Sequence, residues 1–397
     1  MKTPQEVRKD IPFLSKLHYL DSASVCPIPN PVMKAINEYY LEYPLNYGVG
    51  EWECSVLVAS KVDEARAKLA SFINAESSKN IVFTKNTTEA INLVANGIDW
   101  KNGDEVIISS LEHQSNIMPW LRQQEIRGIN VKMAQAEPSG LLNPETVSEL
   151  ITPKTRLVTV THVSNIYGTI MPVKEIGEIS KKAGVLFMVD AAQSGGREQI
   201  DVKDIGCDFL CICGRKSIMG PQGTGALYAK EELLENLTPL NFGSRAGHVM
   251  TDLSYKLNAY PNKFESGVLN TSGVIGLGAA TDYISGIGHE AILKYIRQLT
   301  QQMIDVLQSY KNVVLLGCTD VKHLAGVVSW NVKGIHDSEV VSKLDKIKKV
   351  AVASGSQGSL NAIKPHGVTS VVRTSIHYFS LPEDIQALDD ALKEITK

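Results

Sequence analysis

The stretch RLVTVTHVSNIYGTIMPVKEIGEISKKAGVLFMV, residues 156–189, decides the fold class. It begins with a β-rich run at residues 156–160, continues through a helix-like segment at residues 173–182, and ends in a second β-rich run at residues 185–189. Strand, helix and strand in succession indicate a parallel sheet covered by helices. Both runs are apolar almost throughout, as expected for strands that are buried on both faces.

The same alternation extends in both directions from this stretch. Further β-rich runs lie at residues 80–84, 105–109 and 209–213, with helix-like segments at residues 89–95, 116–126 and 144–151. We therefore predict an α/β fold with a mainly parallel sheet that has helices on both faces.

After about residue 285 the regular alternation of β-rich runs and helix-like segments ends. Residues 289–310 read as one long amphipathic helix, and the last helix is expected to begin at Ser380-Leu-Pro-Glu383, which matches a capping box with Pro in the first turn. The length of 397 residues suggests roughly two domains. We expect a large domain at residues 20–284 and a smaller α+β domain formed by residues 1–19 and 285–397.

The composition excludes several classes of protein. A net charge of −3 gives no indication of nucleic-acid or membrane-surface binding. The N-terminus lacks the apolar core of a signal peptide, and no apolar run approaches the ~18 residues that a membrane helix needs. The six cysteines lack zinc-type pairs, which predicts a reducing, cytoplasmic location.

Polar residues follow each predicted strand of the first domain. In open parallel sheets, ligands bind outside the carboxyl ends of the strands, so these residues are expected to converge on one rim. They include Thr87 and Thr88, His113, His162 and Asn165, Asp190 and Gln193, and Gly214-Arg215-Lys216.

The residues on this rim suit one kind of cofactor when they are taken together. Thr87 and Thr88 would open a helix, whose N-terminus favours a phosphate, and Asp190 could pair with a protonated ring nitrogen. His113 could stack on a flat ring or serve as a catalytic acid or base, and a partly desolvated Lys216 could form a Schiff base. The combination predicts a pyridoxal phosphate site.

Each of these residues also has an ordinary structural interpretation. The threonines could simply cap a helix, Asp190 could sit in a salt bridge, His113 could be a structural histidine, and Lys216 could be a solvated loop lysine. We give His162 no role beyond a structural one. A P-loop is excluded because Arg215 stands where the motif needs the glycine before its lysine, and Leu210 stands at the earlier glycine position.

Several longer segments resemble one known family. They include YLDSA (residues 19–23), NTTEAINLVA (86–95), EHQSNIMPW (112–120), VSNIYGT (163–169), VDAAQS (189–194), GRKSIMGPQGTGALY (214–228), FESGVLNTSGVIGLGAA (264–280) and VVRTSIHYFS (371–380). The chain resembles the class V, fold-type I pyridoxal phosphate enzymes, most closely the cysteine desulfurase and selenocysteine lyase branch. This resemblance implies a large domain with a seven-stranded, mainly parallel sheet and a homodimer with shared active sites.

The resemblance also implies roles for individual residues. Lys216 would bind the cofactor as a Schiff base and later move the Cα proton of the substrate, and Asp190 would hold the ring nitrogen protonated. The remaining expected roles are ring stacking for His113, a hydrogen bond to the 3-oxygen for Gln193, phosphate contacts for Thr87, Thr88, Cys213 and Arg215, a contact with the neighbouring subunit's phosphate for Thr271, and a substrate carboxylate clamp for Asn165 and Arg373.

The sequence departs from the branch at its sulfur-accepting cysteine. That cysteine is expected fifteen residues before Arg373, where this chain has Gly358, and the loop arginine of the same motif is Ala353. A second motif of the branch, Arg-Gly-x-His, is Val49-Gly-Glu-Trp52 here. Cys26 or Cys54 could replace the missing thiol; otherwise both are packing residues, as we expect for Cys207, Cys211 and Cys318.

We therefore predict pyridoxal phosphate-dependent cleavage of the C–S bond of L-cysteine or a related amino acid. Without a loop thiol, the sulfur could leave directly by β-elimination or pass to an external thiol or a sulfur-acceptor protein. The alternatives left open are a class V aminotransferase or epimerase acting on a small amino acid, and a non-catalytic scaffold with the same fold.

Overall fold

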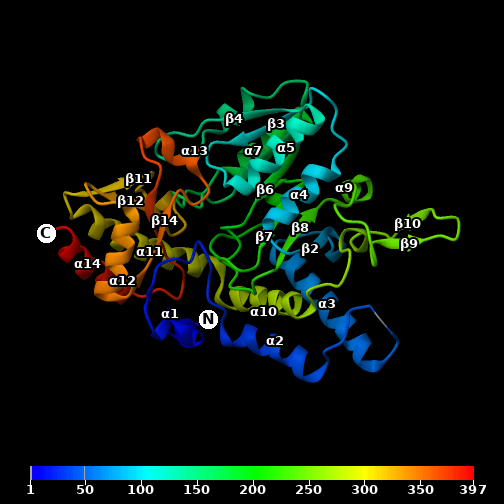
Figure 1. Cartoon of the computed structure of the whole chain (residues 1–397), viewed down its shortest axis with the longest axis horizontal. Coiled ribbons are helices and arrows are strands. Elements are labelled where there is room, and N and C mark those ends of the chain that lie inside the picture. Colours follow the sequence, from blue (N-terminus) through cyan, green and yellow to red (C-terminus); the bar gives the residue numbers. More distant parts are fainter. Residues whose placement is uncertain (1, 49) are drawn as a thin grey trace.

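The computed structural model describes residues 2–48 and 50–397 (Figure 1). Its centre is a seven-stranded sheet in the order β2-β8-β7-β6-β5-β3-β4. The strands are β2 (Ile81–Thr84), β3 (Glu105–Ser109), β4 (Asn130–Ala134), β5 (Thr155–Thr161), β6 (Leu186–Asp190), β7 (Phe209–Cys213) and β8 (Gly225–Ala229). Only β8 runs antiparallel to its neighbours β2 and β7, so the prediction of a mainly parallel sheet is confirmed.

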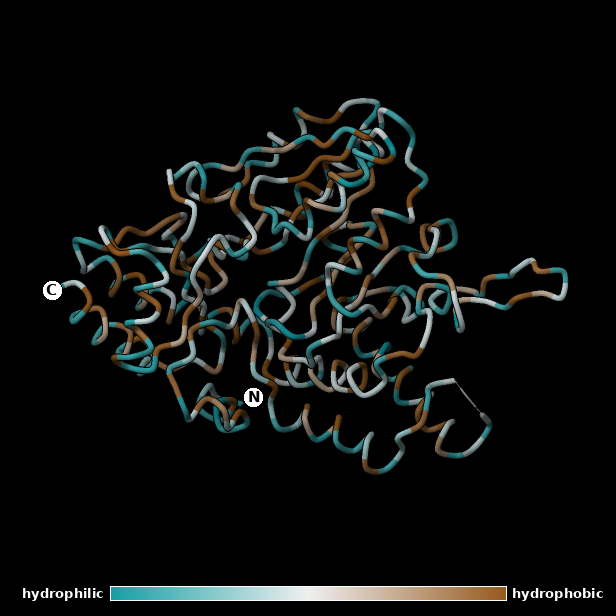
Figure 2. Tube along the Cα trace, viewed as in Figure 1, coloured by the Kyte–Doolittle hydropathy of each residue, from teal (hydrophilic) through white to brown (hydrophobic). Residues whose placement is uncertain are grey.

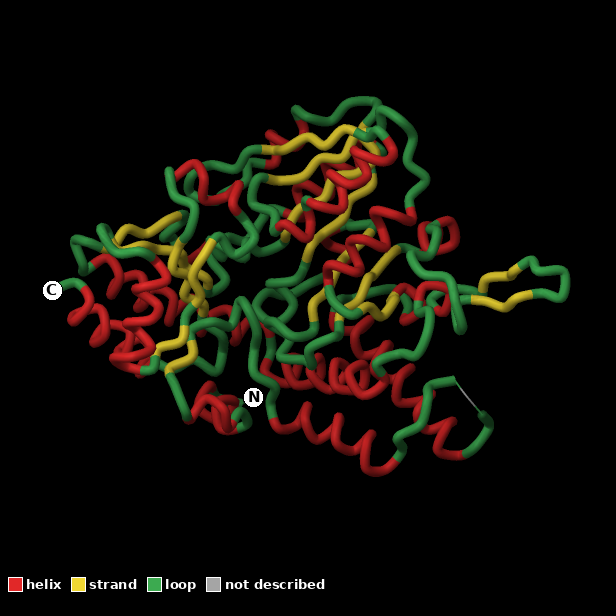
Figure 3. The backbone as a smooth tube through the Cα atoms, viewed as in Figure 1, coloured by secondary structure: helices red, strands yellow, loops and turns green. Residues whose placement is uncertain are grey.

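Helices cover both faces of this sheet (Figure 3). The helices of this part of the chain are α2 (Asn30–Glu42), α3 (Glu53–Phe72), α4 (Thr87–Gly97), α5 (Met118–Arg127), α6 (Pro144–Ser148), α7 (Val173–Ala183), α8 (Val202–Ile205), α9 (Glu231–Asn236) and α10 (Thr271–Ile287), and α2 packs on α10. Alternate residues of β7 face different helices: Phe209 and Cys211 pack in the core of α4 and α5, whereas Leu210 and Ile212 pack in the core of α3, α7 and α10. This double burial explains why the strand sequences are continuously apolar.

The C-terminal part contains a second, four-stranded antiparallel sheet in the order β11-β12-β15-β14. Its strands are β11 (Val313–Leu316), β12 (Val327–Val332), β14 (Ala353–Gly355) and β15 (Val371–Ser375), and its helices are α11 (His289–Gln308), α12 (Asp337–Lys348), α13 (Leu360–Ile363) and α14 (Pro382–Ile395). This is the smaller α+β unit expected from the sequence. The N-terminal segment, with α1 (Pro4–Lys9), joins it through β1 (His18–Tyr19), which pairs in parallel with β13 (Val350–Ala351).

The start of the last helix differs from the prediction. The N-cap of α14 is Leu381 rather than Ser380, and its N–H donates to Asp384 Oδ2 at 2.9 Å, whereas Ser380 Oγ accepts from the N–H of His377. The Asp384 carboxylate also binds Arg8 and His18, which ties this helix to the N-terminal segment.

The hairpin of β9 (Gly247–Val249) and β10 (Tyr255–Leu257) projects from the surface and extends away from both sheets at the right of Figure 1. The outer helix α2 shows alternating teal and brown turns in Figure 2, as expected for a helix with one buried face. No helix of the described chain is long and apolar enough to cross a membrane.

Candidate functional site

The carboxyl ends of the parallel strands surround a cavity of about 80 Å³. Its lining residues come from the segments after β2, β3, β5, β6 and β7: Asn86, Thr87, Thr88, His113, Ser115, Thr161, Asn165, Asp190, Ala192, Gln193, Cys213, Arg215 and Lys216. The cavity therefore brings together the residues predicted to bind the cofactor, except Thr271 and Arg373, whereas His162 and Gly214, also expected at this rim, do not line it.

Lys216 lies in a turn at the start of the connection between β7 and β8, residues 214–224. The turn requires a glycine at position 214, because a Cβ there would lie 2.1 Å from Thr224 Oγ1. No protein group among the described residues hydrogen-bonds or pairs with Lys216 Nζ. Burial lowers the pKa of this amine, and the positive charges of Arg215 and Arg373 lower it further, while Cys213 and Asp190 oppose the shift. An unpartnered amine with a lowered pKa is suited to nucleophilic attack and to carrying a proton.

Asp190 ends β6 and is 3% exposed. Its Oδ1 accepts a hydrogen bond from the N–H of Ala192 at 2.9 Å, and within the described chain no cationic side chain forms an ion pair with it. Burial raises the pKa of this carboxyl. A buried carboxylate with one donor lacks a cationic partner, and a protonated ring nitrogen would supply one.

The N-terminus of α4 forms the wall expected to bind a phosphate. Asn86, which the sequence analysis did not single out, is the N-cap, and its Oδ1 accepts from the N–H of Glu89 at 2.9 Å. The buried hydroxyl of Thr87 has no partner in the described chain, and Thr88 Oγ1 donates to Ser115 Oγ at 2.9 Å. Free helix N–H groups and an unpartnered hydroxyl fit an anionic group here.

His113 is held as a neutral imidazole beside these groups. Burial and the positive charges of Lys216, Arg373 and Arg215 lower its pKa to about 4. Its Nδ1 accepts from the N–H of Ser115 at 3.1 Å, so the proton is assigned to Nε2. A neutral ring held by its own turn is suited to stacking on a flat ligand.

A buried carboxylate that the sequence analysis missed, Glu112, supports this wall. Glu112 is fully buried; its side chain accepts from Asn116 Nδ2 at 2.7 Å and from the N–H of Thr161 at 2.9 Å. Burial raises its pKa to about 7. Glu112 thus joins the turn that carries His113 to the end of β5.

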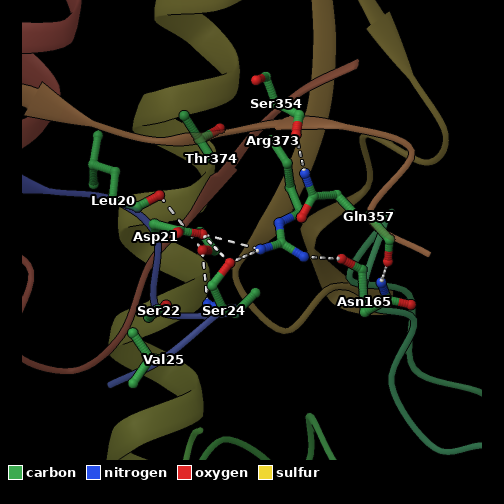
Figure 4. A network of polar contacts seen from close by, with 12 residues as sticks. Leu20, Asp21, Ser22, Ser24, Val25, Asn165, Ser354, Gln357, Arg373 and Thr374 are labelled. Carbon is green, nitrogen blue, oxygen red and sulfur yellow. Dashed lines mark hydrogen bonds and ion pairs between the residues drawn. The ribbon is translucent and has the colours of Figure 1, made fainter. Parts of the chain in front are cut away.

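The predicted carboxylate clamp is present, but protein groups occupy it (Figure 4). Arg373 of β15 donates to the main-chain oxygen of Asn165 at 3.0 Å and pairs with Asp21 at 3.0 Å. Asn165 donates from Nδ2 to the main-chain oxygen of Gln357 at 2.9 Å and accepts at Oδ1 from Ser359 Oγ at 2.8 Å. Arg373 therefore adjoins the cavity through Asn165 rather than lining it.

Gly358 packs directly against His113. The N–H of Gln114 donates to the Gly358 oxygen at 2.7 Å, and a Cβ at position 358 would lie 2.5 Å from His113 Nε2. With a φ of +72°, this position also favours glycine. The segment that would carry the sulfur-accepting cysteine is thus fixed on the site in a form that leaves no room for a side chain.

Neither remaining cysteine candidate is placed to replace that thiol. Cys26 is buried outside the cavity lining; its thiol donates to the Ser22 oxygen, and burial raises its pKa to about 12. Cys54 is exposed on α3 and does not line the cavity. Cys26 lacks the low pKa that a nucleophilic thiol needs. Cys54 lacks a position at the cavity.

The other predicted residues have mixed outcomes. Gln193 lines the cavity, but its Nε2 donates to the Ala23 oxygen at 2.8 Å. Thr271 begins α10 outside the lining, so its contact with a neighbouring subunit stays a prediction. His162 is buried and lies in a different cleft, beside the N-terminus of α7, which agrees with giving it no role in the site. In the segment 49–52, Val49 lies outside the described residues, and Trp52 is exposed.

Comparison with known proteins extends over nearly the whole chain. A protein named "Probable cysteine desulfurase" from Methanothermobacter thermautotrophicus is 41% identical over 394 residues, which is 98% of each chain. A protein named "Cysteine desulfurase" from Pectobacterium atrosepticum is 35% identical over 403 residues, covering 98% of this chain and 97% of the other.

Solved structures agree with the sequence relatives. The apo structure of a cysteine desulfurase from Thermococcus onnurineus superposes with a TM-score of 0.96 at 36% identity, covering 100% of this chain and 98% of that one. The cysteine desulfurase CsdA from Escherichia coli gives 0.92 at 28% identity over 99% and 98%. The family model "Aminotransferase class-V" matches residues 18–388. The chain belongs to the aminotransferase class V family.

Proposed function

We propose that this class V enzyme cleaves the C–S bond of L-cysteine or a closely related amino acid with the help of pyridoxal phosphate. One observation carries the proposal: the cavity presents an unpartnered amine, Lys216, together with a buried carboxylate, Asp190, that lacks a cation. The family and the relatives named cysteine desulfurase support the enzyme class and the cofactor.

The residues of the cavity fit this cofactor, because several of their polar groups have no protein partner in the described chain. The N-terminus of α4 with Thr87 would hold the phosphate, with Arg215 beside it, and Asp190 would hold the ring nitrogen protonated. When bound, pyridoxal phosphate acts as an electron sink that weakens the bonds at the substrate Cα. Lys216 would take the Cα proton on Nζ, and the lowered pKa favours the neutral amine that this transfer needs.

The fate of the sulfur follows from the glycine at position 358. Cys213 lines the cavity, but it is buried at the end of β7, where the phosphate is expected, and no thiol stands in the place of the loop cysteine. The sulfur would therefore leave as sulfide or pass to an external thiol. Departure by β-elimination would leave pyruvate and ammonia, whereas transfer to an external thiol would leave alanine. The acceptor would be a small thiol or a separate acceptor protein.

The assembly and organisation stay part of the proposal. We propose a homodimer, in which Thr271 at the start of α10 reaches the neighbouring active site. The domain limits at residues 20–284, and at 1–19 with 285–397, stay a prediction, as does the cytoplasmic location.

A product assay tests the proposed function. The purified protein loaded with pyridoxal phosphate would be incubated with L-cysteine, with and without dithiothreitol, and sulfide, alanine and pyruvate would be quantified. Sulfide with pyruvate would identify β-elimination, and sulfide with alanine, dependent on dithiothreitol, would identify transfer to an external thiol. No sulfide under either condition would refute C–S cleavage and favour an aminotransferase or epimerase.

A further inference from the structure

The guanidinium of Arg373 has both protons of one nitrogen committed to protein acceptors (Figure 4). Nη2 donates to Asp21 Oδ1 at 3.0 Å and to Ser24 Oγ at 2.6 Å. Nη1 donates to the Asn165 main-chain oxygen at 3.0 Å, and Nε is buried without a partner in the described chain. Ser24 Oγ also donates to Asp21 Oδ1 at 2.8 Å, so the three side chains form a closed triangle.

This arrangement is incompatible with ordinary bidentate binding of a second carboxylate. A carboxylate takes two parallel N–H bonds from neighbouring nitrogens of a guanidinium. The two edges that offer such a pair are Nη1 with Nη2, and Nε with Nη2. Both edges share Nη2. An incoming carboxylate can therefore bind in either way only after Asp21 or Ser24 gives up its hydrogen bond from Nη2.

Burial makes the two partners unequal. Arg373 is 2% exposed and fixed within β15, so it cannot leave the pair, whereas the Asp21 side chain retains 20% of its exposure. Asp21 can therefore turn toward water, where its charge is well solvated. The backbone of Asp21 stays in place through its bridge to Ser375. The side chain is thus the part of this triangle that can move.

We propose that Asp21 is a specificity-determining residue that competes with the substrate's α-carboxylate for Arg373. Binding then exchanges one carboxylate for another, and a substrate without an anionic group at this position cannot displace Asp21. The inference rests on the proposed function, since it takes Arg373 as the group that receives the substrate carboxylate. It defines the substrate class as α-amino acids with a free carboxylate, as opposed to their amides.

Equilibrium binding of two sulfur-free probes tests this exchange. L-Alanine and L-alaninamide would be titrated into the pyridoxal phosphate-loaded protein while the cofactor absorbance is followed. The proteins compared are the wild type, Asp21→Asn, and Asp305→Asn, which removes the same charge from the exposed side of α11. Asparagine keeps an acceptor for Arg373 and removes only the competing charge.

We expect Asp21→Asn to bind L-alanine about tenfold more tightly, because a like charge a few ångströms from the bound carboxylate is removed. Its affinity for L-alaninamide should not change, and Asp305→Asn should match the wild type with both probes. The inference would be overturned if the affinity for L-alanine, divided by that for L-alaninamide, is no higher in Asp21→Asn than in the wild type. Asp21 would then only orient Arg373.

Two further results distinguish a failure of the proposed function from a failure of this inference. A wild type that binds neither probe would overturn the proposed function together with this inference, whereas binding with an unchanged ratio overturns the inference alone. Should Asp21→Asn not fold, Ser24→Ala frees one proton of Nη2 without a change of charge. It should tighten L-alanine binding by a smaller factor, and no tightening would count against the exchange.

Discussion

Gly358→Ala is the substitution whose effect the structure specifies most fully. The added Cβ would lie 2.5 Å from His113 Nε2 and 2.8 Å from His113 Cδ2, closer than non-bonded atoms approach. The ring cannot simply move aside, because its Nδ1 accepts from Ser115 and the neighbouring Gln114 N–H donates to Gly358 itself. The substitution must therefore shift the histidine or the segment that carries position 358.

Two costs add at this position. Holding a residue other than glycine at a φ of +72° costs about 1–2 kcal/mol, and overpacking a close-packed contact costs about 1–3 kcal/mol. We expect Gly358→Ala to lower the free energy of unfolding by about 2–5 kcal/mol. Gly367 has a φ of +71° and no atom within 4 Å of its Cβ position, so Gly367→Ala should lose only the first of these amounts.

Urea-induced unfolding of both variants at one protein concentration measures the difference. The same reasoning predicts that Gly358→Cys does not introduce an efficient sulfur acceptor, because the thiol-bearing residue would first displace His113. Equal losses in Gly358→Ala and Gly367→Ala would refute the packing of Gly358 on His113.

Three further predictions concern other parts of the molecule. Burial lowers the pKa of His162 to about 4, so the unfolded chain gains this proton first as the pH falls from about 6.5 to 4, and this histidine alone should cost the wild type about 3 kcal/mol of stability in that window; His162→Phe should lose less by that amount, and parallel pH–stability curves would contradict this. Arg66 forms a buried bidentate pair with Glu265, so Arg66→Ala should lower the free energy of unfolding by about 3–5 kcal/mol in urea titrations, and a loss under 1 kcal/mol would count against a buried pair. Thr271→Ala should retain less pyridoxal phosphate after dialysis while light scattering still reports a dimer, whereas full retention would contradict a contact with the neighbouring phosphate.

Most of the fold could be predicted because double burial leaves a clear mark on the sequence. The strands β5, β6 and β7 are continuous apolar runs, and each was predicted within a residue or two of its bounds. β4 was missed because it is a partly exposed edge strand with mixed polarity, NVKMA. β8 was not identified because it begins with Gly225 and pairs antiparallel between β7 and the distant β2, an order that the local sequence does not encode.

The residues of the site likewise include some that could be placed from the sequence and some that could not. Lys216, Asp190 and Thr87 could be placed because each directly follows a predicted strand and so reaches the same edge of the sheet. Asp21 could not be linked to Arg373, since the two lie 352 positions apart in the chain and meet only through tertiary packing. Glu112 stood within a recognised motif, but only its complete burial shows that it supports the wall.

Sulfide release from L-cysteine by the wild type and by Lys216→Ala, both saturated with pyridoxal phosphate, tests the central claim most directly. The account predicts catalytic sulfide release by the wild type and none above the protein-free rate by Lys216→Ala, with the fold of the variant intact by circular dichroism. Equal sulfide release by the two proteins, or none by the wild type, would contradict it.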